Sequence, residues 1–169
     1  MIKYVKGDLL LSEAELVAHG VAPGDHFDHG LALALREQWP AMAKDFRHWC
    51  HLRNPKPGDI WQWAGAGGTR IACLLTQESA EKTHGNHPGK AKSEYVNHAL
   101  RGLKQLIEQE KVTSVALPKL ATGLGGLEWE TVKPLLESQL GDLDADIYVY
   151  QEYQAGLKAD EKAVAAPGT

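Results

Sequence analysis

The sequence predicts an α/β fold in which a mostly parallel sheet carries helices on both faces. Short apolar runs of strand length alternate along the chain with longer segments whose apolar residues recur at helical spacing. Clusters of glycine and proline separate these segments, and the 169 residues show neither an internal repeat nor a linker. This alternation of strands and helices favours parallel strands within a single domain.

The first part of the chain supplies three expected strands and one long helical segment. Residues 2–6 form a first strand, and the short apolar run at 16–18 forms a second. Apolar side chains then recur at helical spacing over 31–49, where Pro40 marks a break or a new start. A proline-rich loop leads into a strand at 60–63, whose two tryptophans fall on one face.

The middle of the chain contains the clearest helix. A glycine-rich hairpin turn at 65–68 is expected to precede a buried strand at 71–75. After a long polar loop, residues 96–107 place their apolar side chains on one helical face. A buried strand is then expected at 114–117.

The last expected elements are a helix and a strand. The helix runs from 132 to 140, with Pro134 tolerable only in its first turn. In the strand at 147–150, the Ile and Val side chains fall on the face opposite to the Tyr side chains. We expect residues 1–154 to form the domain and residues 155–169 to form a tail that frays or makes a loose helical end.

Composition narrows the class of protein. The formal net charge is -4, with 18 Lys+Arg against 22 Asp+Glu, so the sequence predicts no broad basic face and no strong affinity for nucleic acid. No segment has the length of a membrane span, and the first residues lack the apolar run of a signal peptide. We therefore expect a cytoplasmic monomer with reduced thiols at Cys50 and Cys73. The five tryptophans are interpreted as core packing.

Two glycine-rich loops are candidates for holding an anion. Residues 20–30 and 121–127 each lie between an expected strand and an expected helix. Glycine lets backbone amides approach phosphate oxygens, and a helix N-terminus adds partial positive charge. Ligands of open α/β sheets bind at the carboxyl ends of strands, where both loops are expected, and two such loops suit a diphosphate. The alternative is that both loops are simply tight turns.

Three motifs together resemble the macrodomain family. They are Gly7-Asp8-Leu9, Val17-Ala18-His19 and the long stretch from Leu117 to Trp129, which is the strongest match. The resemblance covers about residues 2–150 and is greatest to the branch of the terminal ADP-ribose protein glycohydrolases and the antitoxins that reverse DNA ADP-ribosylation. It implies a three-layer α/β/α macrodomain with a mixed sheet, a domain spanning residues 1–154, and an ADP-ribose ligand with no cofactor.

The resemblance also implies roles for individual residues. Asp8 would accept a hydrogen bond from the adenine amino group, although it could equally be a turn or capping residue. The amides of residues 122–126 would hold the diphosphate, and Tyr150 would stack on the adenine, with Tyr148 or Tyr153 as alternatives. The residues expected to contact the ligand are Asp8, Leu9, His19, Gly20, Gly30, Leu31, Gln77, Ala121, Thr122, Gly123, Leu124, Gly125, Gly126 and Tyr150.

The sequence differs from that branch at the two positions that carry the catalytic groups of its members. Members carry a lysine after the fourth strand and an aspartate in the second loop, and here these positions are Gln77 and Gly125, neither of which can act as a nucleophile or an acid–base group. We hypothesise that Asp28, with His26 or His29, replaces that chemistry. The alternative is a solvated polar loop with incidental charges. The candidate catalytic residues are Asp25, His26, Asp28 and His29.

Three functions therefore stay open. The chain could hydrolyse ADP-ribose from a modified protein or nucleic acid, which we favour, or it could read ADP-ribose without cleaving it. A Ser/His/Gly-rich loop at 77–92 is also typical of phosphatases of ADP-ribose 1''-phosphate. Three His-x-x-His pairs invite a metal interpretation, but none is accompanied by a third and fourth ligand, so no metal is expected. They are His26/His29, His48/His51 and His84/His87.

Overall fold

A computed structural model describes residues 1–79 and 88–162. It contains a six-stranded sheet with the order β1-β6-β5-β2-β4-β3, in which every neighbouring pair is parallel except β3 and β4. The strands are β1 (Ile2–Gly7), β2 (Leu16–Val21), β3 (Ile60–Ala64), β4 (Arg70–Leu75), β5 (Ser114–Pro118) and β6 (Asp146–Tyr153). The expected mostly parallel, mixed sheet is confirmed.

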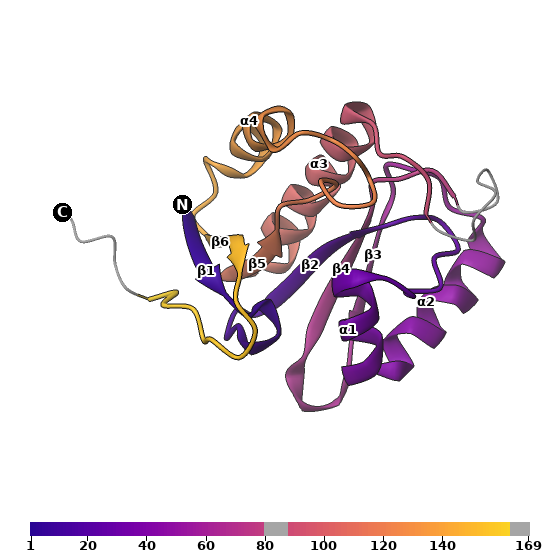
Figure 1. Cartoon of the computed structure of the whole chain (residues 1–169), viewed down its shortest axis with the longest axis horizontal. Helices are drawn as coiled ribbons and strands as arrows, with labels where there is room; N and C mark the ends of the chain where they lie inside the picture. Colours follow the sequence, from indigo (N-terminus) through magenta and orange to yellow (C-terminus); the bar gives the residue numbers. More distant parts are fainter. Residues whose placement is uncertain (80–87, 163–169) are drawn as a thin grey trace.

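In the described residues, four α-helices cover the two faces of the sheet, which gives the expected three layers (Figure 1). The helices are α1 (Gly30–Gln38), α2 (Pro40–Arg53), α3 (Ser93–Glu110) and α4 (Trp129–Leu140), with short 3-10 turns at Leu9–Leu11 and Ala66–Gly68. Helices α3 and α4 lie on one face, and α1 and α2 lie on the other. None of the described helices combines the length and the apolar character that crossing a bilayer requires.

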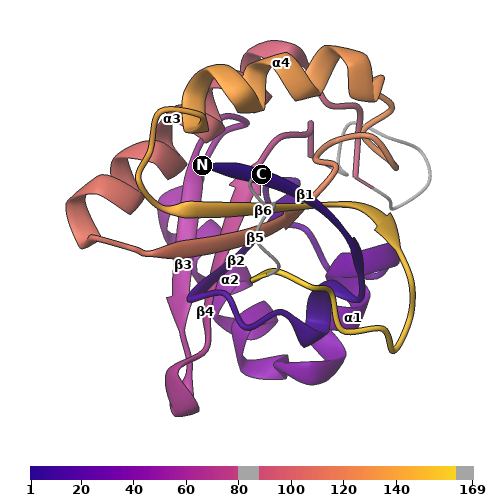
Figure 2. The same cartoon turned by 90° about the vertical axis from the view of Figure 1, so that its left-hand side faces the viewer.

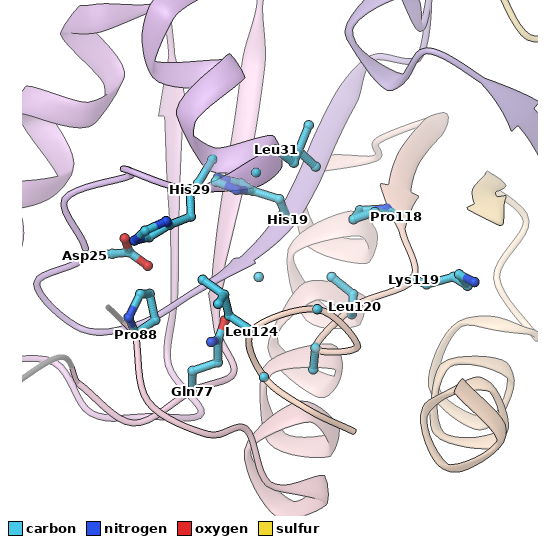
Figure 3. A pocket seen from close by; sticks show the side chains of 16 residues that line it. His19, Asp25, His29, Leu31, Gln77, Pro88, Pro118, Lys119, Leu120 and Leu124 are labelled. Atoms are coloured by element: carbon cyan, nitrogen blue, oxygen red, sulfur yellow. The ribbon is translucent and has the colours of Figure 1, made fainter. Parts of the chain in front are cut away.

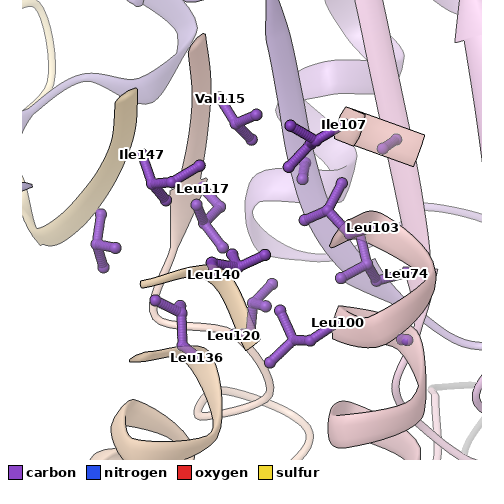
Figure 4. Packing of buried hydrophobic residues seen from close by; sticks show 14 of the residues in the cluster. Leu74, Leu100, Leu103, Ile107, Val115, Leu117, Leu120, Leu136, Leu140 and Ile147 are labelled. Carbon is purple, nitrogen blue, oxygen red and sulfur yellow. The ribbon is translucent and has the colours of Figure 1, made fainter. Parts of the chain in front are cut away.

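Two large apolar cores and a smaller apolar cluster around Tyr148 and Tyr150 hold the layers together. On the α3/α4 face, Leu100 and Leu103 of α3 meet Leu136 of α4 over the strand side chains (Figure 4). On the other face, Phe27 and Phe46 pack together with ring centroids 5.1 Å apart. As predicted, four tryptophans pack against this second core and one against the first; they are Trp39, Trp49, Trp61, Trp63 and Trp129.

Several elements extend beyond their expected bounds, and two of these differences have a clear physical reason. Strand β2 continues to Val21, three residues past the predicted end, because β4 pairs with residues 17–21 and supplies ladder hydrogen bonds that local sequence cannot reveal. Helix α4 begins at Trp129, so Pro134 lies in its second turn rather than in the first. The prediction for Pro134 was wrong because Trp129 packs against the core and starts the helix a turn earlier.

The C-terminal segment packs against the domain. Residues 154–162 turn back past the end of β1, where the amide of Asp8 donates to the carbonyl of Leu157 at 2.7 Å (Figure 2). Ala159 and Glu161 are buried there. The described part of the expected tail is thus neither frayed nor helical, because it fills space beside the strand end; residues 163–169 lie outside the described residues.

The parallel topology places several loops at one edge of the sheet. Strands β2, β4 and β5 are neighbours and run in the same direction, so their carboxyl ends lie together. The loop from β2 to α1 and the loop from β5 to α4 both leave from this edge. These are the two glycine-rich loops of the sequence.

Candidate ligand-binding cleft

Both glycine-rich loops border one cleft at the carboxyl edge of the sheet (Figure 3). The loop after β2 forms one wall, the loop after β5 forms another, and the start of the β4–α3 connection closes the floor. The lining residues are His19, Gly20, Asp25, His29, Gly30, Leu31, Ala32, Gln77, Pro88, Pro118, Lys119, Leu120, Ala121, Gly123, Leu124 and Gly125. Eleven of the eighteen candidate residues from the sequence are among them.

The loop after β5 presents a run of amides without partners. Its ends are tied by Leu127, whose amide donates to the carbonyl of Ala121 at 3.0 Å, and by a second bond from Gly126 to Gly123 at 3.1 Å. Within the described part of the chain, the amides of residues 122–125 donate no hydrogen bond. Consecutive free amides in a glycine-rich loop form a concave anion site.

Gly125 is held in this loop by close packing. A Cβ placed there would lie 2.6 Å from the carbonyl oxygen of Ala121 and 2.9 Å from the Cβ of Ala91. The fold therefore leaves no room for an aspartate at this position. Gly123 differs, because a Cβ there would meet nothing within 4 Å.

The loop after β2 is shaped by a buried carboxylate. Asp25 accepts hydrogen bonds from the amide of Ala22 at 3.0 Å and from the amide of Phe27 at 2.8 Å. Phe27 adopts a left-handed φ of 59° and buries its ring in the core, which turns the chain towards α1. Burial raises the pKa of the Asp25 carboxyl, although its two backbone hydrogen bonds oppose that shift.

The structure separates the four candidate catalytic residues into two pairs. Asp25 and His29 line the cleft, and Figure 3 shows the His29 ring extending towards the side where Asp25 lies. His26 and Asp28 instead face a hollow over α2, where Asp28 forms a salt bridge with Arg36. The structure therefore does not bring Asp28 into the cleft. The loop turns at Phe27, and the sequence could not show which pair faces inward.

His19 is the most deeply buried polar group of the cleft. It is 1% exposed, and its Nε2 lies 3.3 Å from the Sγ of Cys73. Among the described residues, nothing partners its Nδ1. Burial lowers the pKa of His19 to about 4, so the ring is neutral at physiological pH. Buried polar atoms are normally satisfied, so a lone Nδ1 beside a cleft suggests that a ligand or water completes it.

Three expected ligand contacts, among them both expected adenine contacts, do not line the cleft. Asp8 accepts from the amides of Leu10 and Gly156, both at 3.0 Å. Tyr150 is 5% exposed and donates its hydroxyl to Glu161, so its ring does not form an open platform. Leu9 shares an apolar cluster with Tyr150, and the cleft residue Leu31 packs against this cluster.

Three other candidate residues form hydrogen bonds that shape the cleft or the loop beside it. Gln77 lines the cleft, but its Nε2 donates to the carbonyl of Gly89 at 3.0 Å. Thr122 and Gly126 do not line the cleft. The hydroxyl of Thr122 donates to the carbonyl of Lys119, and the amide of Gly126 donates to the carbonyl of Gly123, which tightens the turn. These two hydrogen bonds hold the loop after β5, and therefore its free amides, in place.

Sequence reasoning missed five residues that line the cleft. Three of them directly follow the predicted strand at 114–117, and this position at a strand end was the available signal. Figure 3 shows the side chain of Lys119 extending away from the centre of the cleft. The missed residues are Ala32, Pro88, Pro118, Lys119 and Leu120.

Metal ligands do not gather in the described residues. No group of three or more His, Cys, Asp or Glu side chains there is placed to hold a metal ion. The pair His84/His87 lies outside the described residues. Cys50 and Cys73 are both free thiols, as expected.

Known proteins share this fold and this sequence pattern. The Macro domain family matches residues 74–136. A DNA ADP-ribosyl glycohydrolase of Mycobacterium bovis is 31% identical over 157 residues, which cover 88% of this chain and 42% of that protein. An ADP-ribose 1''-phosphate phosphatase of Lodderomyces elongisporus is 26% identical, and the match covers 88% of this chain and 98% of that protein.

A solved structure extends the comparison to three dimensions. The macrodomain of Thermus aquaticus DarG superposes with a TM-score of 0.77 at 28% identity, covering 89% of this chain and 98% of that one. The chain spans about two fifths of the length of the first curated relatives that it matches. The resemblance inferred from the sequence motifs is confirmed.

Proposed function

We propose that this chain is a macrodomain whose cleft binds ADP-ribose, and that the chain removes ADP-ribose from a modified macromolecule. One observation carries the binding proposal. The residues with free amides at 123–125 and the N-terminus of α1 border the same cleft. Amides and a helix dipole from two directions suit the two phosphates of a diphosphate.

The diphosphate would be held by the backbone alone. Among the described residues that line the cleft there is no Arg, and the side chain of the one Lys, Lys119, extends away from the centre. A protein with a formal net charge of -4 does not attract an anion through its overall field. Binding would therefore depend on local amide geometry, which explains why a glycine stands at position 123.

His29 is the group we propose for proton transfer. Hydrolysis adds water to the anomeric carbon of the distal ribose as the bond to the modified group breaks and the leaving group takes up a proton. The imidazole of His29 is exposed at the cleft and can act as the acid or the base for that proton. Asp25 would orient the loop that carries His29, since both of its oxygens already accept backbone amides.

A non-catalytic reader of ADP-ribose is the second candidate. It is favoured by the carboxamide of Gln77, which is tied to Gly89, and by the lack of space for an acidic side chain at Gly125. The lysine and aspartate chemistry of the related branch has no counterpart at either position. The name of the Lodderomyces relative adds phosphatase activity as a third outcome to test.

Two measurements separate these candidates. Calorimetric titration of the chain with ADP-ribose tests binding, and Gly123→Glu is the matched variant, because its carboxylate would enter the anion site without a backbone clash. Incubation with ADP-ribosylated DNA, ADP-ribosylated protein and ADP-ribose 1''-phosphate tests turnover. We expect binding that Gly123→Glu eliminates, together with release of ADP-ribose from one macromolecule. Binding without release from any substrate would leave the reader, and no binding would refute the proposal.

A further inference from the structure

A basic surface lies next to the cleft on the exposed side of α2. Two hollows meet there, one over α2 and the end of α1, the other between α2 and the loop after it. Both are lined by His26, Arg47 and His51. The loop that carries His26 also carries His29, which lines the cleft, so this loop separates the cleft from the hollows.

Cationic and imidazole side chains recur along this helix on one face. Lys44, Arg47, His48 and His51 are spaced three or four residues apart, and all four are exposed. This spacing aligns them in a stripe about 10 Å long. Lys56 extends the stripe into the second hollow.

Asp28 and Glu78 line the two hollows, and they and the nearby Asp45 have partners other than the cations of the stripe. Asp45 is the one acidic residue of α2, and it accepts a hydrogen bond from the indole of Trp63 at 2.9 Å, towards β3. Asp28 pairs with Arg36, and Glu78 accepts from the hydroxyl of Tyr95 at 2.6 Å. The stripe therefore keeps a local positive character in a chain whose net charge is negative.

We propose that this basic shelf binds the sugar–phosphate backbone of a single nucleic-acid strand. The shelf consists of His26, Lys44, Arg47, His48, His51 and Lys56. Its length matches about two or three successive phosphates. Binding of the strand to the shelf is independent of the proposed function. The further step, in which a modified nucleotide of that strand reaches the cleft, rests on the proposed function.

The layout favours a strand over an acidic or phosphorylated protein. A single phosphate group on a protein would need one compact cluster of basic side chains. Here the cationic and imidazole side chains repeat over successive turns of α2 and continue into a second hollow. Neither hollow is lined by an aromatic side chain other than the imidazoles, so the shelf offers no Phe, Tyr or Trp for base stacking. Binding should therefore depend on salt and little on base sequence.

The test uses an unmodified strand and two matched double variants. A fluorescein-labelled thymidine oligonucleotide of about 12 nucleotides is titrated with the protein at about 50 mM salt, and anisotropy is recorded. Lys44→Glu with Arg47→Glu reverses two shelf charges. Arg101→Glu with Lys104→Glu makes the same change at the same spacing on α3, which covers the opposite face of the sheet.

We expect the shelf variant to lose roughly tenfold in affinity for each phosphate contact removed, and its salt dependence to become shallower. The α3 variant should stay near wild type, and both should keep the wild-type circular dichroism spectrum. Absence of wild-type binding, equal loss in both variants, or tighter binding of a phosphoserine peptide through the same residues would overturn the proposal. An ADP-ribose titration, run in parallel, reports on the proposed function separately, since the shelf lies outside the cleft.

Discussion

The hydroxyl of Tyr150 at the end of β6 donates a hydrogen bond to the carboxylate of Glu161, 2.6 Å away in the C-terminal segment. Glu161 is 7% exposed, and it also accepts from the hydroxyl of Ser12 and from the amide of Glu13 at 3.1 Å. Three donors thus replace water around a buried carboxylate. This network fixes the C-terminal segment against the domain.

Removing that hydroxyl should destabilise the domain. Tyr150→Phe keeps the ring but leaves the buried carboxylate with one donor fewer, and we expect the free energy of unfolding to fall by about 2 kcal/mol. Urea denaturation followed by fluorescence measures it. Tyr153→Phe is the control, because Tyr153 is 65% exposed. Equal stabilities of the two variants would contradict the role of the network.

His19 predicts a loss of stability in mild acid. Its pKa is about 4 in the folded chain and 6.5 in the unfolded chain, because burial disfavours the imidazolium. Between these values the unfolded chain binds a proton that the folded chain excludes, so stability is complete above pH 6.5 and falls as the pH drops through this window.

The expected size of this effect is about 2 kcal/mol between about pH 8 and pH 5. Urea denaturation at both pH values measures it. His19→Gln, which cannot titrate, should show a smaller pH dependence than the wild type, while keeping a polar group at the cleft. An unchanged pH dependence in this variant would show that His19 does not stay neutral in the folded chain.

Two glycines of the same loop should respond differently to substitution. Gly125→Ala should lower the free energy of unfolding by about 1–3 kcal/mol, because the new methyl group meets the carbonyl of Ala121. Gly123→Ala should leave stability nearly unchanged, because that position is open. Thermal unfolding distinguishes them. Comparable losses at both positions would mean that the loop packs differently.

Turnover should depend on His29 and not on Asp28. His29→Ala should lower kcat by about 10²-fold or more, with ADP-ribose affinity preserved, because His29 lines the cleft and is proposed to move the proton. Asp28→Asn is the matched control, since Asp28 pairs with Arg36 outside the cleft. Release of ADP-ribose under saturating substrate measures kcat. A larger loss in Asp28→Asn would reverse the assignment.

Local pattern was sufficient for most of the fold. The single apolar face of residues 96–107 was enough to predict helix α3. The alternation of side chains predicted the two faces of the last strand, since Ile147 and Val149 lie in the core under α3 and α4, and Tyr148 and Tyr150 lie in the small cluster on the opposite face. The extra length of β2 did not follow, because its last residues are held by β4, which is distant in sequence.

The sequence by itself determined the α/β class, the two glycine-rich loops and the family resemblance, because periodicity and short motifs are local properties. Only the tertiary structure decided which side chains share the cleft. It turned His29 inward and Asp28 outward, and it packed Glu161 on Tyr150. It also gathered a basic shelf in an acidic chain. Such neighbourhoods depend on long-range packing and on side-chain direction, which no run of adjacent residues encodes.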